Sequence, residues 1–534
     1  MTRPLTPRRP AAFARRPIVL ALLLLLLVPG LSRAQGSVPL EFREDPATGL
    51  ATVIPIGWNA LGQGLHARLP GASDFVLLAV QAAPATPVQV WTSLLPQLGL
   101  DAAPEPVGTR QTPIGVFTLY QVDVDGLTGT LGVDVALADN DGTTYLVLFQ
   151  ALQPEFAALR GDIFLPAVDA LTPVASEPTP DPATLPYTAE EVTFTGGDPD
   201  VTLAGTLTLP RTAGPHPAIV LVGGSGPQDR DESLRPVSAI KPLALVADAL
   251  SRAGLVVLRY DDRGVAESTG DYAGAALSDF TDDLAAALAW VRERPEVDAA
   301  RTGVLGHSEG GVYIASLIET GEPLAFAVGV APPATNGVDL LVEQNGAILA
   351  STGAADDEVE LTEGYARRLY AEVLAGDLEA AEALTREYFD GFFDRQTPEL
   401  QATIGDRTAF IDSQVTRQLA AIEPPWFADL LRSDAGIGWA LATMPVLGVF
   451  GGKDVQVVAE QNVPLMEVQL AAGHPASRVV TIPDANHLFQ AATTGSVAEY
   501  GTLEPVFTPD FLPLVTAWVT DVTAHRAPGS SPAP

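Results

Sequence analysis

The sequence predicts a two-domain α/β protein whose larger domain is a doubly wound, mostly parallel sheet with a helical cap insertion. Two observations support this prediction. Beyond residue 186, short continuous apolar runs alternate with segments of helical periodicity, as in a sheet buried on both faces. One of these runs ends in a glycine-flanked serine and is followed directly by a helix of small residues. Residues 39–172 instead predict a smaller N-terminal α+β domain, because short β-rich runs dominate there.

The first 34 residues have the features of a secretory signal peptide. Five arginines precede the apolar run Ile18–Val28, and the small residues of Ser32–Ala34 follow it. The run is too short to span a bilayer. The mature protein is therefore expected to be exported, to the periplasm or the extracellular space, without a membrane span. The paired arginines leave both the general secretory route and the twin-arginine route open.

Charge and cysteine content exclude several classes of function. The chain of 534 residues has a formal net charge of −35, which argues against nucleic acid or an anionic membrane surface as a partner. It contains no cysteine, so disulfides, a thiol nucleophile and thiolate metal sites are excluded. The oligomeric state is left undetermined by the sequence.

The smaller domain is expected to be a non-catalytic accessory module. The run Ile54–Trp58 (Ile-Pro-Ile-Gly-Trp) and the strand order resemble the small α/β sandwich domains related to the photosystem PsbP protein. His66 is the one histidine of this domain, and it is expected at the surface because no acidic cluster accompanies it. The expected strands are Leu50–Trp58, Phe75–Val80, Gly115–Val122 and Thr144–Phe149, and the expected helices are Pro87–Leu98 and Gln153–Asp162.

A proline-rich segment, residues 173–186, predicts the linker between the domains. The larger domain is expected over residues 187–525, and residues 526–534 are expected to be a disordered tail. The strands of the larger domain are expected at 191–195, 203–209, 218–222, 255–260, 302–305, 326–330, 446–450 and 478–482. Its helices are expected at 241–253, 279–294, 312–319, 459–472 and 509–524. Residues 331–444 interrupt the alternation with further helices and predict the cap.

The serine that ends the central strand, Ser308, is predicted to be a nucleophile. It stands in Gly306–Gly310 (Gly-His-Ser-Glu-Gly), between an apolar strand and a helix, which is the context of a nucleophile elbow. The turn leaves no room for side chains at its flanks, which explains the glycines.

The general base and the acid that would act with this serine can be predicted from their positions after expected strands. Of the six histidines, His487 alone follows an expected parallel strand. The acid is expected in the loop after the preceding strand, where Asp454 stands after two glycines. Asp484 is the rival acid, but it lies three residues before the base and is expected to be a turn former. The other histidines lie elsewhere: His66 in the smaller domain, His216 and His474 before strands, His307 within the elbow with its side chain opposite to that of Ser308, and His525 at the end of the last helix.

Two backbone N–H groups are needed to stabilise the oxyanion of acyl transfer. One is expected from Glu309, the residue after the nucleophile, at the start of a helix. The other is expected from the glycine-rich loop after the first parallel strand, from Ser225 with Gly224 as its neighbour.

These motifs together resemble the exported or thermostable carboxylesterase branch of the α/β-hydrolases, which is related to serine aminopeptidases and acylaminoacyl-peptidases. They are Gly223–Asp231, Arg259–Gly264, Ser268–Gly270, Gly306–Gly311, Gly451–Asp454 and Asn486–His487. The resemblance implies hydrolysis of short-chain carboxylic esters by Ser308, Asp454 and His487, without a metal or cofactor. An aminopeptidase that uses the same triad, and a catalytically silent binding protein on this fold, remain open as alternatives.

Two further groups of residues have expected roles. The charged residues Asp229, Arg230, Asp231, Asp261, Asp262 and Arg263 are expected to brace loops through ion pairs. The aromatic residues of the cap are expected to form the cap's own core. Some of them are also expected to contact the acyl group and set the acyl-chain preference, because ligand pockets are mostly apolar. Phe392 and Phe393 are the main candidates for this role.

Overall fold

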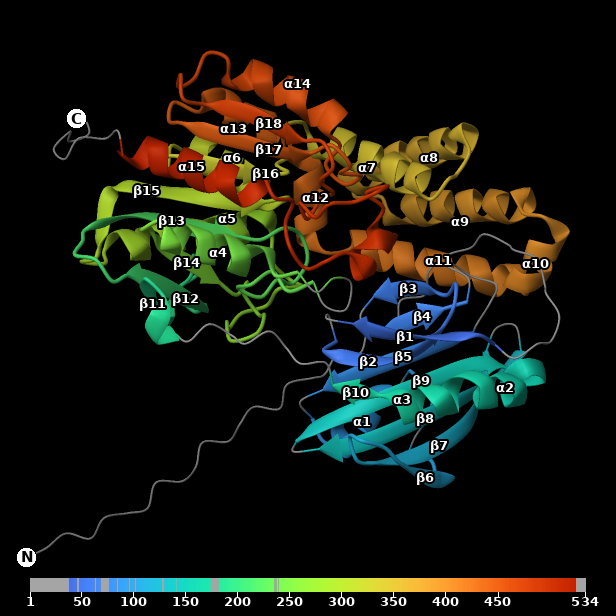
Figure 1. Ribbon diagram of the computed structural model, residues 1–534. Helices are drawn as coiled ribbons and strands as arrows, with labels where there is room; N and C mark the ends of the chain where they lie inside the picture. The colour runs from blue at the N-terminus through green and yellow to red at the C-terminus, as the bar shows by residue number, and fades with distance from the viewer. Residues whose placement is uncertain are drawn as a thin grey trace, which may run out of the picture. The chain divides into compact units, whose positions relative to one another are not determined.

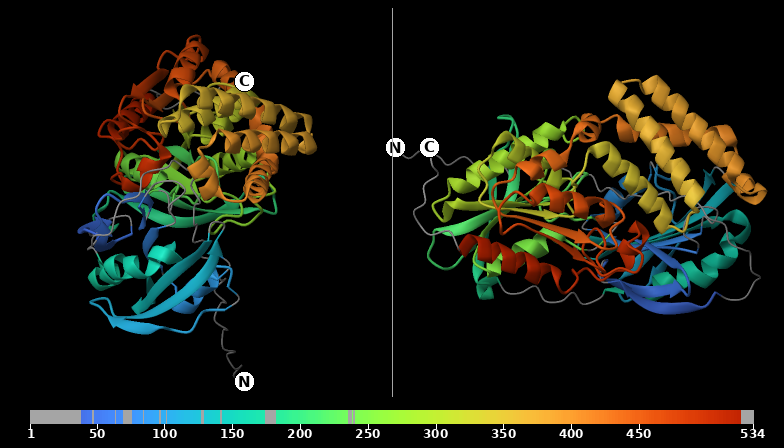
Figure 2. Two further views of the ribbon diagram at one scale, coloured as in Figure 1. Left: turned by 90° about the vertical axis from the view of Figure 1, so that its right-hand side faces the viewer. Right: turned by 90° about the horizontal axis from the view of Figure 1, so that it is seen from above.

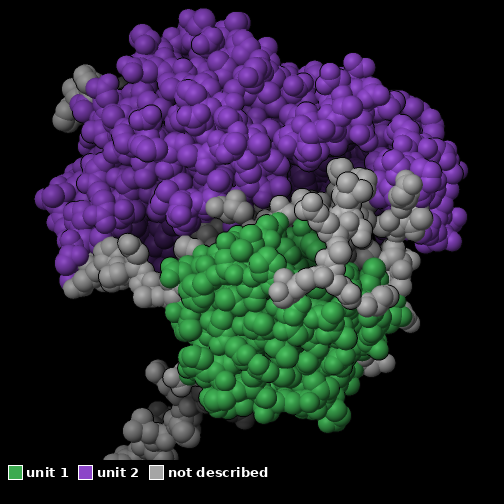
Figure 3. Space-filling view, turned by 45° about the vertical axis from the view of Figure 1, so that its right-hand side comes forward, with its two compact units in different colours: residues 1–60, 64–175 green, residues 61–63, 176–534 purple. Residues whose placement is uncertain are grey.

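The computed structural model describes residues 38–524 apart from 46–47, 63, 69–75, 84, 96, 101, 127–128, 141, 174–181, 235–237 and 239. The expected signal peptide, most of the expected linker, His525 and the expected C-terminal tail lie outside the described residues. The chain forms two compact units, residues 1–60 with 64–175 and residues 61–63 with 176–534 (Figure 3). Within the described residues, no helix is long and apolar enough to cross a membrane.

The first unit is an α+β structure, as expected. A seven-stranded sheet has the order β3-β4-β5-β9-β8-β7-β6, and a three-stranded sheet has the order β1-β2-β10. The strands are β1 (Leu40–Asp45), β2 (Leu50–Pro55), β3 (Asn59–Gly62), β4 (Leu65–Ala67), β5 (Leu77–Ala83), β6 (Gly108–Gln111), β7 (Val116–Gly126), β8 (Gly129–Asn140), β9 (Thr143–Leu152) and β10 (Thr172–Pro173). The helices are α1 (Pro87–Leu94), α2 (Gln153–Leu159), the π-helical turn η1 (Arg160–Phe164) and α3 (Leu165–Ala170).

The surface position expected for His66 is wrong. The residue lies on β4 opposite Leu78 of β5, and it is 4% exposed. All three residues of β4 are buried, and His66 lines a small pocket together with Arg43, Leu50 and Ile54 of β1 and β2. Burial first, and the charge of Arg43 second, together lower the pKa of His66 to about 4, so the ring is neutral at pH 7.

The second unit is built on an eight-stranded sheet with the order β11-β12-β14-β13-β15-β16-β17-β18 (Figure 1). The leading strands β11 and β12 pair antiparallel, and β12 also runs antiparallel to β14. The pairings from β14 through β18 are parallel. The strands are β11 (Tyr187–Thr195), β12 (Thr202–Pro210), β13 (His216–Val222), β14 (Val256–Tyr260), β15 (Val297–His307), β16 (Ala327–Val330), β17 (Val446–Gly451) and β18 (Arg478–Ile482).

Helices cover both faces of this sheet (Figure 2). One layer contains α4 (Pro242–Arg252) and α15 (Phe511–Ala524), which contact each other. The other layer contains α5 (Leu277–Arg292), α6 (Gly310–Thr320), α13 (Ala435–Leu441) and α14 (Ala459–Leu470), which contact one another in sequence order along the sheet. The strands between these layers are buried on both sides, which explains their continuous apolar sequences.

The helical cap lies between β16 and β17. Its helices are α7 (Gly337–Ser351), α8 (Asp356–Ala375), α9 (Leu378–Arg395), α10 (Pro398–Ile404), α11 (Arg407–Ile422) and α12 (Pro425–Arg432). In Figure 1, α8, α9 and α11 lie to the right of the sheet and pack mainly on one another. Their aromatic rings form the cap's own core, as expected: Tyr365 stacks on Tyr388, and Phe393 packs on Phe410.

Candidate active site

The expected site residues all follow carboxyl ends of parallel strands, at one edge of the sheet. Ser308 follows β15, Ser225 lies in the loop after β13, Asp454 follows β17 and His487 follows β18. β13, β15, β16, β17 and β18 are consecutive in the sheet. The crevice outside the carboxyl ends of such strands is where ligands bind in open α/β sheets.

Ser308 occupies a strained turn between β15 and α6. Its φ of 52° lies in the left-handed region, which residues other than glycine rarely adopt. Its N–H donates to the carbonyl of Val330 at 2.9 Å, and its side chain is half-buried. The flanking glycines are required by close approach: a Cβ on Gly306 would lie 2.5 Å from the Gly310 carbonyl oxygen, and one on Gly310 would lie 2.7 Å from that of Gly223. The sequence-based reason for the glycines is therefore correct.

Asp454 and His487 form a buried hydrogen-bonded pair. The distance between His487 Nδ1 and Asp454 Oδ2 is 2.8 Å, and the two residues are 4% and 5% exposed. The other carboxylate oxygen accepts the N–H groups of Gln456 and Val457 at 2.7 and 3.0 Å, which fix its orientation. The bond at Nδ1 leaves Nε2 as the nitrogen able to exchange a proton with a substrate or nucleophile. Between the described atoms of Ser308 and His487 no hydrogen bond is formed, and such bonds are commonly long before substrate binds.

The loops that carry this pair approach each other closely. A Cβ on Gly451 would lie 2.5 Å from the Ala485 carbonyl oxygen, and one on Gly452 would lie 2.6 Å from that of Pro483. The glycines before Asp454 therefore let its loop pack directly on the histidine loop. The side chain of the rival acid, Asp484, is exposed and makes no described contact with the imidazole.

The amide positions are compatible with the two expected oxyanion donors, Ser225 and Glu309. The Ser225 and Glu309 N–H groups make no described hydrogen bond within the protein, and Glu309 is the N-cap of α6. Gly224 differs, because its N–H donates to Glu232 Oε1 at 2.9 Å. The Gly224 N–H, expected at the oxyanion hole as the neighbour of the Ser225 donor, is therefore already used within the protein. Gly224 instead provides space, since a Cβ there would lie 3.0 Å from Ser308 Cβ.

The Glu309 side chain is buried directly after the nucleophile. Glu309 Oε1 accepts the Tyr313 hydroxyl at 2.5 Å, and Oε2 has no partner in the described structure. Burial raises the pKa of Glu309 to about 7, and the Tyr313 hydrogen bond opposes this rise. The carboxyl of Asp262 is nearby, and its pKa is also raised, by burial first and by the Glu309 charge in part. Together these groups make an acidic, desolvated environment on one side of the serine.

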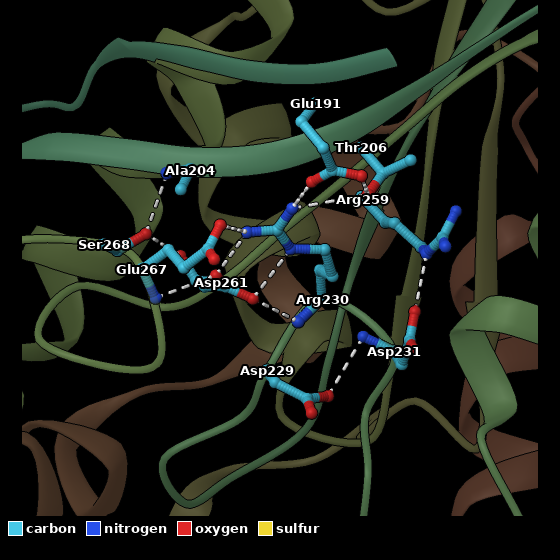
Figure 4. Close-up of polar contacts among 10 residues, drawn as sticks. All are labelled: Glu191, Ala204, Thr206, Asp229, Arg230, Asp231, Arg259, Asp261, Glu267 and Ser268. Carbon is cyan, nitrogen blue, oxygen red and sulfur yellow. Dashed lines mark hydrogen bonds and ion pairs between the residues drawn. The ribbon is translucent and has the colours of Figure 1, made fainter. Parts of the chain in front are cut away.

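The charged loop residues brace the structure, largely as expected (Figure 4). Arg230 forms a bidentate pair with Asp261, at 3.0 and 2.7 Å, and also contacts Glu191. Asp231 pairs with Arg259 at 2.8 Å. Ion pairs with Asp283 and Asp279 hold Arg263 in the same way. Asp229 and Asp262 differ, because their carboxylates accept backbone N–H groups in place of forming ion pairs.

Sequence reasoning missed two buried residues next to the site, Glu232 and His307. His307 was set aside because it belongs to the elbow, and Glu232 was not singled out from the acidic loop. In the structure their side chains bond to each other at 2.6 Å. The His307 ring also lies 4.7 Å from the His487 ring, between ring centroids. The available signal was a histidine at the end of one buried strand, β15, and a glutamate in the loop after its neighbour, β13.

The fold and the site geometry define the class. An eight-stranded sheet with an antiparallel second strand, a serine in a strained strand–helix turn and a histidine–aspartate pair on later loops are the features of an α/β-hydrolase. The second unit therefore has the α/β-hydrolase fold.

Sequence comparisons agree with this class. Residues 197–462 match the family described as X-Pro dipeptidyl-peptidase (S15 family). Esterase EstD of Thermotoga maritima is 29% identical over 287 residues, which span 54% of this chain and 58% of the relative. Both comparisons are with hydrolytic enzymes.

Similar solved structures include an esterase of Pyrococcus furiosus, with a TM-score of 0.39 and 14% identity over 65% of this chain and 95% of that one. Acetyl xylan esterase 1 from Thermoanaerobacterium has a TM-score of 0.35 and 18% identity, over 65% of this chain and 86% of its own. The fold assignment rests on the strand order of the sheet, because likeness at these TM-scores is low.

Among the described residues, no group of three or more potential metal-ligating side chains comes together.

Proposed function

We propose that the chain hydrolyses short-chain carboxylic esters through an acyl-enzyme intermediate, with Ser308, His487 and Asp454 as the triad. The observation that supports this most is the 2.8 Å bond between Asp454 and His487, at the same sheet edge as a serine held at a φ of 52°. The sequence similarity to an esterase supports the ester as substrate.

In the proposed reaction, Ser308 Oγ attacks the ester carbonyl carbon while His487 Nε2 accepts its proton. The Ser225 and Glu309 N–H groups donate to the oxyanion of the tetrahedral intermediate. His487 then protonates the alcohol as the bond from carbon to the alkoxide oxygen breaks. Water, deprotonated by His487, attacks the acyl-enzyme, and the acid leaves as Ser308 regains its proton.

Asp454 acts through His487 in this scheme. Its carboxylate accepts the Nδ1 hydrogen, which fixes the imidazole tautomer and stabilises the imidazolium that forms in each half-reaction. The two backbone N–H groups on its other oxygen keep the carboxylate in place. No further group is required for the proton transfers.

The test is a pair of assays on the full chain. A nitrophenyl butyrate ester should be hydrolysed, and Ser308→Ala should abolish that hydrolysis. If the ester is untouched while an aminoacyl nitroanilide is cleaved, the proposed substrate class is wrong. A peptidase is the second candidate function, because the match over residues 197–462 is to a family of dipeptidyl-peptidases.

We also propose that the enzyme is exported. The support is the arginine-rich start followed by the apolar run Ile18–Val28. N-terminal sequencing of protein recovered from the periplasm or medium should begin close to residue 35. Mature protein that retains Met1 in the cytoplasm would contradict export.

A further inference from the structure

A buried pair of side chains, Glu232 and His307, connects two loops of the proposed site. Glu232 is 1% exposed and His307 is 5% exposed. Glu232 Oε1 accepts hydrogen bonds from the Gly224 N–H, at 2.9 Å, and from His307 Nδ1, at 2.6 Å. The other ring nitrogen of His307, Nε2, lies 3.0 Å from the His487 carbonyl oxygen. A single chain of hydrogen bonds therefore runs from the oxyanion loop, through the elbow, to the loop of the base.

With Glu232 ionised, the partners of the His307 ring require both of its nitrogens to carry hydrogen. The His487 carbonyl can only accept, and Glu232 Oε1 already accepts an N–H from Gly224. A neutral ring would direct a lone pair at one of these oxygens. Two protons on the ring give an imidazolium beside a carboxylate, so the buried pair has no net charge.

The charges around His307 agree with this protonation state. Burial alone would lower the pKa of His307, but the charge and hydrogen bond of Glu232 and the carbonyl of His487 raise it above its ordinary value. The charge of Asp454, which lies behind His487, contributes in the same direction. Among the described residues, Glu232, His487 and Asp454 are the titratable groups that face this ring.

Backbone strain marks the same place. Glu232 has a φ of 56°, and Ser308, the residue after His307, has a φ of 52°. Left-handed backbone at a residue other than glycine is strained and persists where surrounding contacts enforce it. For Glu232 the enforcing contacts are its bonds to Gly224 and His307.

We propose that Glu232 and His307 are positioning residues that hold the oxyanion loop and the His487 loop in register around Ser308. The proposal rests on the proposed function of the same site. Glu232 fixes the Gly224 amide, and this sets the direction of the next amide in the chain, that of Ser225. His307 fixes the main chain of His487 and packs against its ring. Neither side chain touches the substrate.

Two substitutions separate the links of this chain. Glu232→Gln keeps an acceptor for the Gly224 N–H but removes the charge, so the buried ring loses a proton and its bond to the His487 carbonyl. His307→Phe keeps a ring beside His487 but removes both donors. Asp484→Asn is the matched control, because this exposed carboxylate on the His487 loop contacts neither residue.

The assay is the rate at which a fluorophosphonate probe labels Ser308, measured on the full chain well below the unfolding temperature. Misplacement of reacting groups by about 1 Å can cost 10²-fold. Each of the two variants should therefore label on the order of 10- to 100-fold more slowly than the wild type. With nitrophenyl butyrate the loss should appear in kcat and leave KM within a few-fold. The double variant should lose no more than the worse single variant, because both changes break one chain of contacts.

Labelling rates within about two-fold of the wild type, with a shift in the unfolding midpoint alone, would make the pair a packing feature and overturn the proposal. The control should label at the wild-type rate. If the wild type labels but hydrolyses no ester, the proposed substrate is wrong, whereas the labelling comparison still tests the positioning role.

A measurement on the wild type decides the matter if the variants do not fold. ¹⁵N-histidine NMR at pH 7 should show one imidazole with both nitrogens protonated. The signals of this ring should stay separate from those of the other histidine rings. A spectrum in which each of the six rings has an unprotonated nitrogen at pH 7 would remove the charge pair on which the proposal depends.

Discussion

Replacing Glu309 by glutamine should stabilise the protein at alkaline pH, and the gain should disappear in acid. The carboxyl is 5% exposed, and burial raises its pKa from 4.5 to about 7. The folded chain therefore retains a proton that the unfolded chain releases above pH 4.5. A raised carboxyl pKa costs no stability below the unfolded value, and its cost grows as the pH rises from 4.5 to 7 and is constant above.

The magnitude follows from the size of the shift. A difference of one pKa unit is about 1.4 kcal/mol, so the shift to about 7 makes the wild type less stable by roughly 3 kcal/mol at pH 8. At pH 5 the raised pKa makes the wild type less stable by less than about 1 kcal/mol. Glutamine carries no charge at either pH, and its carbonyl oxygen can still accept the Tyr313 hydroxyl. Its NH₂ group, in the place of the unpartnered Oε2, adds a cost that does not depend on pH.

The assay is urea unfolding at pH 5 and pH 8 at constant ionic strength, followed by tryptophan fluorescence. The free energy of unfolding of Glu309→Gln minus that of the wild type should rise by about 2 kcal/mol or more between the two pH values. Glu319→Gln is the matched control, because Glu319 is exposed on the same helix, α6, and should show no such rise. A difference that is equal at pH 5 and pH 8, or that falls with pH, would refute the reasoning.

Three further predictions follow from the contacts of single side chains. Asp454→Asn should lower kcat on the order of 10⁴-fold by favouring the wrong imidazole tautomer, while Asp484→Asn should leave it unchanged; equal losses in ester assays would refute the acid assignment. Arg230→Met should cost about 3 kcal/mol in urea unfolding because it leaves a buried aspartate unpaired, whereas Arg252→Met, at an exposed pair, should cost little. Phe393→Ala should cost about 3 kcal/mol in the same assay, because the ring is buried in the cap core. The sequence favours a role for Phe393 in acyl-chain preference, but the ring packs on Phe410 inside the cap, so the variant should leave the acyl-length profile from acetate to decanoate unchanged. A shift toward long chains would show that the ring lines the acyl pocket.

The sheet could be predicted from the sequence because each of its strands has a local signature. The six parallel strands and the antiparallel pair β11–β12 were expected close to their observed positions, since a strand covered on both faces reads as a continuous apolar run. Ser308, Asp454 and His487 could be singled out for a related reason. Each directly follows such a run, and carboxyl ends of parallel strands meet at one edge.

Features that depend on pairing across the chain were not predictable in this way. β8 is not among the expected strands, and in the structure its Asp134 is buried against Arg160, a partner that no local pattern reveals. The surface position expected for His66 is wrong because burial on both faces of β4 depends on which distant segments pack against the sheet, and residues of β1 and β2 lie beside His66. The Glu232–His307 bond joins residues 75 apart, and no local periodicity marks such a contact. The Gly224 amide likewise has a partner that only the folded loop provides.

The most direct test of the account is the steady-state kcat/KM of three alanine variants on nitrophenyl butyrate. Ser308→Ala and His487→Ala should each lose on the order of 10⁴-fold or more, while His474→Ala should stay close to the wild type. His474 is a suitable control because it lies in a turn before β18, where its Nδ1 accepts the Ala476 N–H. Activity retained in Ser308→Ala, or lost in His474→Ala and kept in His487→Ala, would contradict the assignment of the site.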